Sequence, residues 1–147
     1  MRRGALVALA LLPLAGGCAK HVPYALSTQD QQRFGGHVLR IALPHRNPAF
    51  FGLDDCTLYR AETAHEEIVG WTKVLASDWG QDTPKFMTVC TSQHVKYDGK
   101  YLIADFCAQA IGAGGGCAGS GTYRSRTGDV QGWQILTGRG WETLPKN

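Results

Sequence analysis

Hydrophobic and polar positions alternate in several segments of the chain, a period typical of half-buried β-strands. Between His37 and Leu43, aliphatic side chains point to one side and the residues between them to the other. Shorter segments of similar character predict further strands over residues 56–62, 122–126, 133–137 and 141–144. Residues 44–52, which contain two prolines, are expected to form a loop.

The strongest local signal is the segment VKYDGKYL, residues 95–102. Asp98 and Gly99 favour the positive φ angles of a type I′ turn between two apolar runs. The segment therefore predicts a β-hairpin with a two-residue turn. Counting outward from that turn, Tyr97 faces Lys100, and this register places every other pair of facing residues.

Two segments have helical features. The first, residues 27–34, begins with Ser27, a favourable N-cap, and is followed by two glycines that can end a helix. The second follows a capping-box pattern, and its apolar residues recur at helical spacing over residues 64–77. Gly70 and several β-branched residues lower its helix propensity, so a strand over residues 67–76 is the alternative.

Together these elements predict an α+β domain that is mostly antiparallel β. We expect a small sheet or partly open barrel with one or two short helices, stabilised by disulfides. The chain has 147 residues, a length that supports a single domain. Its 44% hydrophobic and 10% aromatic residues are too many for a disordered chain. We expect the globular domain to span residues 27–147.

The N-terminal residues have the pattern of an export signal. Two arginines precede an apolar stretch, Ala5–Leu14, which is too short to span a bilayer. Small residues then lead to Cys18, an order that resembles the signals of bacterial lipoproteins, whose cysteine is lipidated. We expect residues 1–17 to be a signal peptide, Cys18 the lipidated residue, and residues 18–26 a tether. Cleavage after Ala19, which would remove Cys18, is the alternative.

Lipidation predicts a location in the cell envelope. Acyl chains such as palmitate would anchor the protein to the outer membrane, facing the periplasm, because the non-acidic Ala19 favours that membrane in such lipoproteins. The alternative cleavage predicts a secreted or soluble periplasmic protein. The formal net charge is +3, and loss of Arg2 and Arg3 would leave 13 basic against 12 acidic residues. Such a balance is unlike that of a nucleic-acid-binding protein, and no nucleic-acid partner is expected.

The four cysteines after Cys18 predict two disulfides, because exported proteins meet an oxidising compartment. Their spacing is unlike that of a zinc site. In the register of the predicted hairpin, Cys90 faces Cys107 at a separation that permits a disulfide. This pairing leaves Cys56 to bond with Cys117. A bulge would shift the register, and Cys107–Cys117 is the competing pair.

Motifs for catalysis or cofactor binding are weak. The glycine-rich segment 112–121 fits a dinucleotide-binding pattern, but a strand follows it instead of a helix, so we expect a flexible connection. The five histidines lack metal-binding spacing, and no metal or cofactor is expected. In the predicted hairpin Ser92 faces Asp105, with His94 diagonal to it, so a small periplasmic hydrolase is the alternative function. No nucleophile motif accompanies them, and we do not expect an enzyme.

Aromatic and arginine side chains, which are enriched at the centres of protein interfaces, gather in the C-terminal part of the chain. The candidate binding residues are Tyr123, Arg124, Arg126, Trp133, Arg139 and Trp141. At least one of the two tryptophans is expected in the core of the sheet. We therefore expect a small protein-binding module of the envelope with a protein partner, acting as an inhibitor, an immunity protein or an accessory to an envelope machine.

Overall fold

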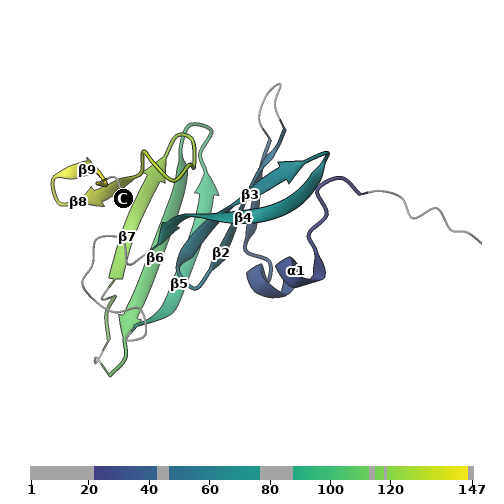
Figure 1. Ribbon diagram of the computed structural model, residues 1–147. Coiled ribbons are helices and arrows are strands. Elements are labelled where there is room, and N and C mark those ends of the chain that lie inside the picture. The colour runs from purple at the N-terminus through teal and green to yellow at the C-terminus, as the bar shows by residue number, and fades with distance from the viewer. Residues whose placement is uncertain (1–21, 43–46, 77–87, 113–114, 118, 146–147) are drawn as a thin grey trace, which may run out of the picture.

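The computed structural model describes residues 22–42, 47–76, 88–112, 115–117 and 119–145. This part of the chain contains one short helix and nine strands (Figure 1). They are α1 (Thr28–Phe34), β1 (Val38–Ile41), β2 (Ala49–Asp54), β3 (Thr57–Ala64), β4 (Glu67–Ala76), β5 (Thr88–Tyr97), β6 (Leu102–Ala110), β7 (Gly119–Ser125), β8 (Gln134–Thr137) and β9 (Gly140–Thr143).

The strands form two open sheets in which each strand pairs with its neighbour along the chain. Strands β1 to β4 make the first sheet and β5 to β9 the second, and every pairing is antiparallel. Residues of both sheets meet in one hydrophobic core. Its larger members are Ile41, Phe51, Leu53, Leu58, Val74, Leu75, Leu102, Phe106, Tyr123 and Trp133. The predicted fold class is confirmed, with open sheets in place of a closed barrel.

Helix α1 begins and ends where its capping residues predict. Ser27 accepts a hydrogen bond from the backbone of Asp30 at 3.1 Å, and Gly35 adopts the left-handed conformation (φ +59°) that ends the helix. Phe34, in the last turn, is 1% exposed, and its ring centroid lies 4.5 Å from that of Trp71 in β4. This contact packs the predicted helix against the first sheet.

The predicted signal peptide, residues 1–17, and the predicted lipid site Cys18 lie outside the described residues. Within the predicted tether, Tyr24 already contacts the first sheet. Its ring centroid lies 5.3 Å from that of Phe50, and its backbone N–H donates to the carbonyl of Glu66 at 2.6 Å. None of the helices in the described part of the chain is long and apolar enough to cross a membrane.

The helix expected over residues 64–77 is wrong, because residues 67–76 form strand β4. His65 and Glu66 have positive φ angles of 50° and 63°, as in the two-residue turn of a β-hairpin. The apparent capping box is therefore the turn between β3 and β4. Pairing with β3 along the strand, together with the β-branched residues, outweighs the helical spacing of the apolar positions.

The loop expected over residues 44–52 is also wrong for the residues of this segment that belong to a strand. Residues 44–46 lie outside the described residues, but residues 49–52 belong to β2, which pairs with both β1 and β3. Phe50 is 6% exposed and Phe51 2%. Both faces of β2 are covered, so two consecutive phenylalanines are buried and the strand lacks the alternation by which half-buried strands are recognised.

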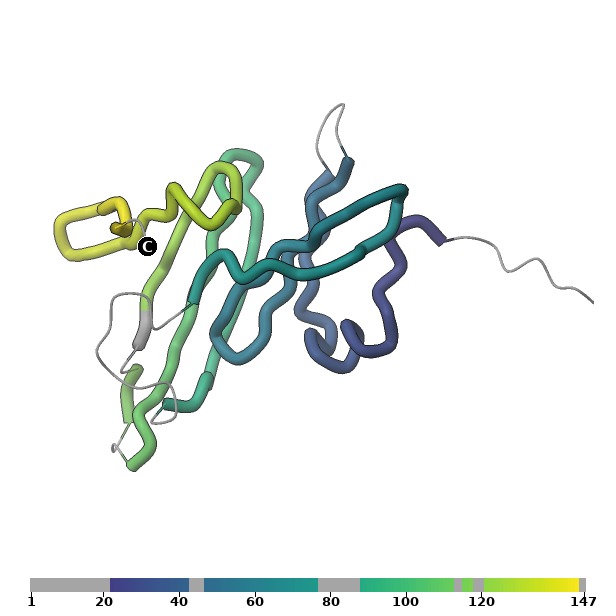
Figure 2. Tube along the Cα trace, in the orientation of Figure 1, coloured from purple at the N-terminus to yellow at the C-terminus, as the bar shows by residue number. Residues whose placement is uncertain are grey.

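The helix and the last hairpin lie at opposite ends of the molecule. Residue 22, where the described chain begins, lies at the same end as α1, whereas β8 and β9 project at the far side of the second sheet (Figure 2). The surface of the second sheet near β8 and β9 is therefore remote from the point where the chain leads toward its N-terminus.

Candidate functional site

Strand β7 divides its side chains between the core and the surface. Tyr123 and Ser125 are 1% and 2% exposed and face the first sheet, so Arg124 and Arg126 face outward. Pairing across the sheet sets Arg124 beside Ile103 of β6 and Gln134 of β8. The two arginines are thus placed side by side on the outer face of the second sheet.

Arg124 is held between two aromatic rings. Its guanidinium carbon lies 4.0 Å from the ring centroid of Trp141 and 4.5 Å from that of Tyr101. Its Nε donates to the side-chain oxygen of Gln134 at 2.8 Å. Among the described residues, its terminal nitrogens Nη1 and Nη2 have no hydrogen-bond partner. The side chain is therefore fixed in direction while its two outer nitrogens stay available to a ligand.

Arg126 contacts the hydroxyl group of Tyr101. Its Nε and Nη2 lie 3.4 and 3.3 Å from the Tyr101 hydroxyl oxygen. The hydrogen bond from Arg126 lowers the pKa of Tyr101 below its usual value, against partial desolvation, and the charges of Arg126, Lys100 and Arg124 add to the effect. We call Tyr101, Arg124, Arg126 and Trp141 the arginine–aromatic cluster.

The arginines of this cluster have no carboxylate within ion-pair distance among the described residues, where the ion pairs are Arg33–Asp54 and Arg60–Asp129. The nearby carboxylate of Asp98 accepts instead from the backbone N–H groups of Lys100 and Tyr101, at 2.8 and 2.7 Å. The positive charge of the cluster is therefore not neutralised by the described part of the protein.

A pocket of about 380 Å³ lies beside the cluster. It is lined by Tyr101, Arg124, Ser125, Arg126, Thr127, Gly132, Gln134 and Thr143. A guanidinium group presents its N–H donors in a plane, a geometry that matches a carboxylate or phosphate. The arrangement can thus bind an anion, and its charge is in place before any ligand arrives.

A larger groove of about 920 Å³ adjoins this pocket. Its lining comes from both sheets and from the connection between β7 and β8, and it shares Thr127, Gly132 and Thr143 with the pocket. Unlike the pocket, the groove contains carboxylates, and its polar side chains interact with one another. Arg60 is paired with Asp129, and the Glu62 carboxylate accepts a hydrogen bond from Thr72.

Three of the six predicted binding residues, Arg124, Arg126 and Trp141, belong to the cluster. The structure places Tyr123 and Trp133 elsewhere, because each is 1% exposed and part of the core. Arg139 is exposed in the turn between β8 and β9.

Tyr101 is the member of the cluster that sequence reasoning missed. It directly precedes β6, one position before the pair formed by Leu102 and Ser125. Extending that antiparallel pairing by one residue places Tyr101 opposite Arg126. The correct register of β6 and β7 was therefore the signal that would have identified it.

The residues of the alternative hydrolase site occupy other positions than expected. Tyr97 pairs with Leu102, so Ser92 faces Cys107 and His94 faces Asp105. Ser92 and His94 are exposed, and no hydrogen bond joins the three side chains among the described residues. They therefore do not form the hydrogen-bonded chain of nucleophile, base and orienting acid that a catalytic triad has, although His94 and Asp105 are cross-strand neighbours.

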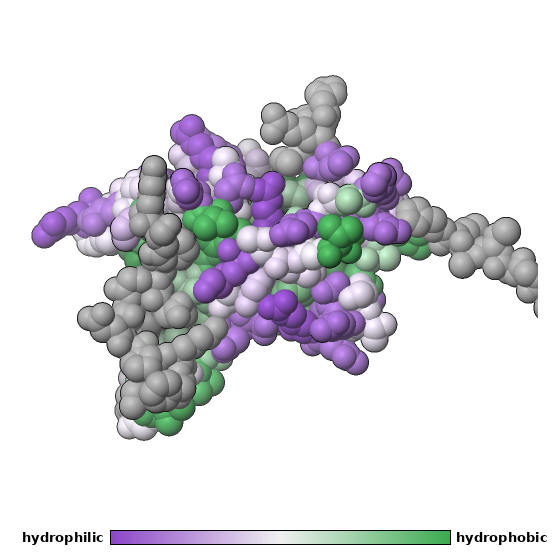
Figure 3. Space-filling view, in the orientation of Figure 1, coloured by the Kyte–Doolittle hydropathy of each residue, from purple (hydrophilic) through white to green (hydrophobic). Residues whose placement is uncertain are grey.

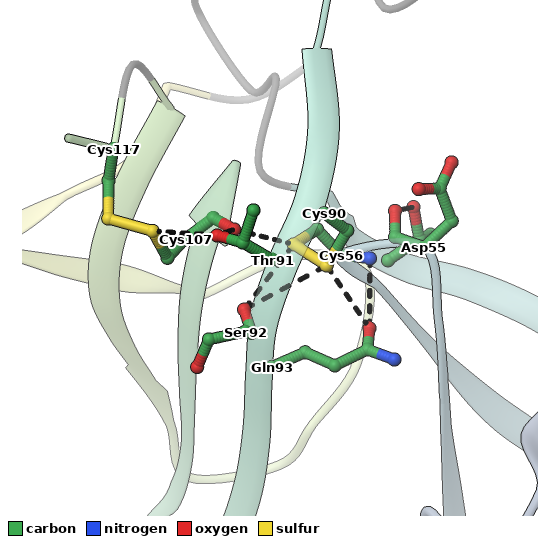
Figure 4. Close-up of a disulfide and its surroundings, with 9 residues drawn as sticks. Asp55, Cys56, Cys90, Thr91, Ser92, Gln93, Cys107 and Cys117 are labelled. Atoms are coloured by element: carbon green, nitrogen blue, oxygen red, sulfur yellow. Dashed lines mark hydrogen bonds between the residues drawn. A yellow bond between two sulfur atoms is a disulfide. The ribbon is translucent and has the colours of Figure 1, made fainter. Parts of the chain in front are cut away.

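All four cysteines are bonded, but the favoured pairings Cys90–Cys107 and Cys56–Cys117 are wrong, and the competing pair Cys107–Cys117 is present. Cys56 is joined to Cys90 and Cys107 to Cys117, with Cα–Cα distances of 5.4 and 5.0 Å (Figure 4). A bulge at Thr91 pairs Cys90 with Ala108 and Ser92 with Cys107. Cys90 consequently faces inward, toward the first sheet, whereas Cys107 faces outward.

The Cys56–Cys90 bond ties the two sheets together. Cys56 is 1% exposed, and its backbone N–H donates to the side chain of Gln93 in β5 at 2.9 Å (Figure 4). Cys107 belongs to β6 and Cys117 lies in the glycine-rich segment, so the second bond closes a short loop with a sequence separation of 10. The first bond therefore constrains tertiary structure, and the second a local connection.

Comparison with protein-family models, curated protein sequences and solved structures gave no significant match to this chain. The surface of the described residues is mostly hydrophilic in the view of Figure 3, with apolar residues in separate spots. The large exposed apolar residues likewise belong to several different elements.

Proposed function

We propose that the protein is an exported bacterial envelope lipoprotein that binds another envelope protein through the arginine–aromatic cluster. The observation that carries the proposal is the position of Arg124, which Tyr101, Trp141 and Gln134 hold in place while its outer nitrogens stay unpartnered. A side chain ordered before binding loses less conformational entropy when the partner arrives. Arginine, tryptophan and tyrosine are also the residues most enriched at interface hot spots.

The placement of the cluster supports a tethered binding role. Residue 22 lies at the end of the molecule near α1, and the β8–β9 hairpin lies at the other end (Figure 1). An anchor on Cys18, followed by a tether over residues 18–26, would leave the cluster directed away from the outer membrane and into the periplasm. This orientation suits an inhibitor, an immunity protein or an envelope accessory, which acts by contact and needs no cofactor.

The binding role predicts that substitutions in the cluster lower the affinity for the envelope partner. Trp141→Ala and Arg126→Ala should each weaken capture of the envelope partner by about 1–2 kcal/mol without unfolding the domain. Arg40→Ala is the matched control, since Arg40 is exposed on β1 of the first sheet. The measurement is quantitative pull-down from envelope extract, with circular dichroism to confirm folding.

Two further variants separate binding from the hydrolase alternative. Ser92→Ala and His94→Ala should leave capture unchanged, because neither side chain belongs to the cluster. A hydrolytic activity that both substitutions abolish, while all binding persists, would show that the proposed binding role is wrong.

The anchor predicts a specific mass. After expression in a Gram-negative host, the mature chain should begin at Cys18 and carry acyl chains, and intact-mass spectrometry measures this directly. Cys18→Ser should abolish the lipid mass and release the protein from the membrane fraction. An unmodified mature chain that begins at Lys20 would instead establish the soluble periplasmic or secreted alternative.

A further inference from the structure

The pocket and the groove beside the arginine–aromatic cluster differ in charge balance. In the groove, the charges of Arg60 and Asp129 cancel, and Glu62 accepts a hydrogen bond from Thr72. In the pocket, Arg124 and Arg126 have no carboxylate partner among the described residues. A ligand that fills both would therefore place its negative charge in the pocket and its uncharged part in the groove.

The chemistry of the pocket favours a carboxylate. The two free nitrogens of Arg124 can form a bidentate pair with both oxygens of a carboxylate, and Arg126 supplies a second guanidinium next to it. Lys100 adds positive charge, with its Nζ 5.3 Å from the ring centroid of Tyr101. The rings of Trp141 and Tyr101, whose centroids lie 4.0 and 4.5 Å from the Arg124 guanidinium carbon, hold that group in place for the pair.

The groove favours a peptide as the source of that carboxylate. The apolar side chains of Val74, Val130 and Leu144 line it, together with threonine hydroxyls and backbone. Because Thr127 and Gly132 line both the groove and the pocket, a segment crossing from one to the other would place an acidic residue in the pocket and an apolar neighbour in the groove.

We infer that the partner docks through a segment in which an acidic side chain enters the pocket between Arg124 and Arg126 and an adjacent apolar side chain enters the groove. This inference rests on the proposed binding function and names the chemistry of the partner. The partner is a protein segment and not an anionic membrane surface, because β7 and β9, which carry Arg124 and Trp141, lie on the opposite side of the molecule from α1, where the described chain begins (Figure 1).

The test is an NMR titration of the protein purified from the envelope of its expression host, in non-ionic detergent. The probe is a blocked peptide in which glutamates alternate with leucines, and its matched control is the same peptide with glutamine in place of glutamate. The glutamate peptide should shift the Nε–H resonances of Arg124 and Arg126 and the indole resonance of Trp141. It should bind about tenfold more tightly than the glutamine peptide, and raised salt should weaken it.

Variants assign the effect to the pocket. Arg124→Gln and Arg126→Gln should each lower the affinity for the glutamate peptide by about tenfold and leave the weak affinity for the glutamine peptide unchanged. Arg124→Lys keeps the charge but not the planar pair of donors, so it should restore only part of the affinity. Arg40→Gln, in the first sheet, should have no effect.

The outcomes separate this inference from the proposed function. Equal binding of the two peptides, or no binding of either while Trp141→Ala still weakens partner capture, overturns the inference and leaves the binding function standing. Binding to phosphatidylglycerol vesicles through Arg124 and Arg126, without peptide binding, overturns it in favour of a lipid headgroup. Normal partner capture by the arginine variants, despite loss of peptide binding, overturns the proposed contact surface itself.

Discussion

Replacing Trp133 with alanine is expected to lower the free energy of unfolding by about 3–5 kcal/mol, as for other large buried aromatic residues. Trp133 is 1% exposed, and its indole N–H donates to the carbonyl of Asp129 at 2.7 Å. Its backbone carbonyl also accepts from the N–H of Leu144 at 2.9 Å. The substitution would therefore leave a cavity beneath the connection between β7 and β8, and the carbonyl of Asp129 would lose its indole donor.

Trp141→Ala is the matched control for this prediction, because Trp141 lies half-buried on the outer face of the same small hairpin. It should cost much less stability, about 1 kcal/mol, since it removes a cation–π contact and little core volume. Urea denaturation followed by circular dichroism gives both values. Equal losses in the two variants would contradict the assignment of one tryptophan to the core and the other to the binding surface.

Removal of the Cys56–Cys90 disulfide should destabilise the protein by about 3–4 kcal/mol, which is the chain-entropy value for a bond with a sequence separation of 34. The Cys56→Ala, Cys90→Ala double variant measures this loss by chemical denaturation. The Cys107→Ala, Cys117→Ala variant should lose less, about 2.5–3 kcal/mol, because its bond has a separation of 10.

Peptide mapping without reduction provides the direct check of connectivity. The peptide that contains Cys90 should be joined to the peptide that contains Cys56. A peptide joining Cys90 to Cys107 would instead show that the hairpin has the register in which Tyr97 faces Lys100, so that the two cysteines face each other.

The elements that could be predicted are those whose signal is local. Ser27 and Gly35 bound the helix because capping depends on a few adjacent residues. Strand alternation likewise identified β7, β8 and β9. The helix prediction for residues 67–76 was wrong because the apolar spacing of this segment fits a helix as well as a strand. Only pairing with β3 decides between the two.

The register of the hairpin formed by β5 and β6 could not be predicted from its turn sequence alone. Asp98 and Gly99 marked the turn, but the Asp98 carboxylate accepts from the backbone of Lys100 and Tyr101, which centres the turn on Gly99 and Lys100. The facing pairs consequently move by two positions as far as Ser92, and the bulge at Thr91 takes one of these positions back, so that Cys90 pairs with Ala108. The turn therefore displaces Ser92 and His94 from their expected partners, and the bulge, which depends on tertiary contacts, turns Cys90 inward to Cys56.

For the candidate site, the residue types in the C-terminal part of the chain indicated binding chemistry, but the sequence did not show which of these side chains lie on the surface. Arg124, Arg126 and Trp141 have the interface chemistry that the sequence indicates, and they meet on one face. Trp133 has the same chemistry and lies in the core, because it fills the space beneath the β7–β8 connection. Residue type alone does not distinguish these two fates of an aromatic residue.

The alternation of core and surface residues in β7 has a consequence for how the second sheet assembles. A one-residue slip in the pairing of β7 would turn Arg124 and Arg126 toward the hydrophobic core and expose Tyr123. The free-energy cost of burying two unpaired guanidinium groups is far larger than the stabilisation that the shifted strand pairing would provide. The arginines thus disfavour sheets in which β7 is paired out of register. A partner that binds the charge of the arginines would therefore bind only chains whose strands have paired correctly.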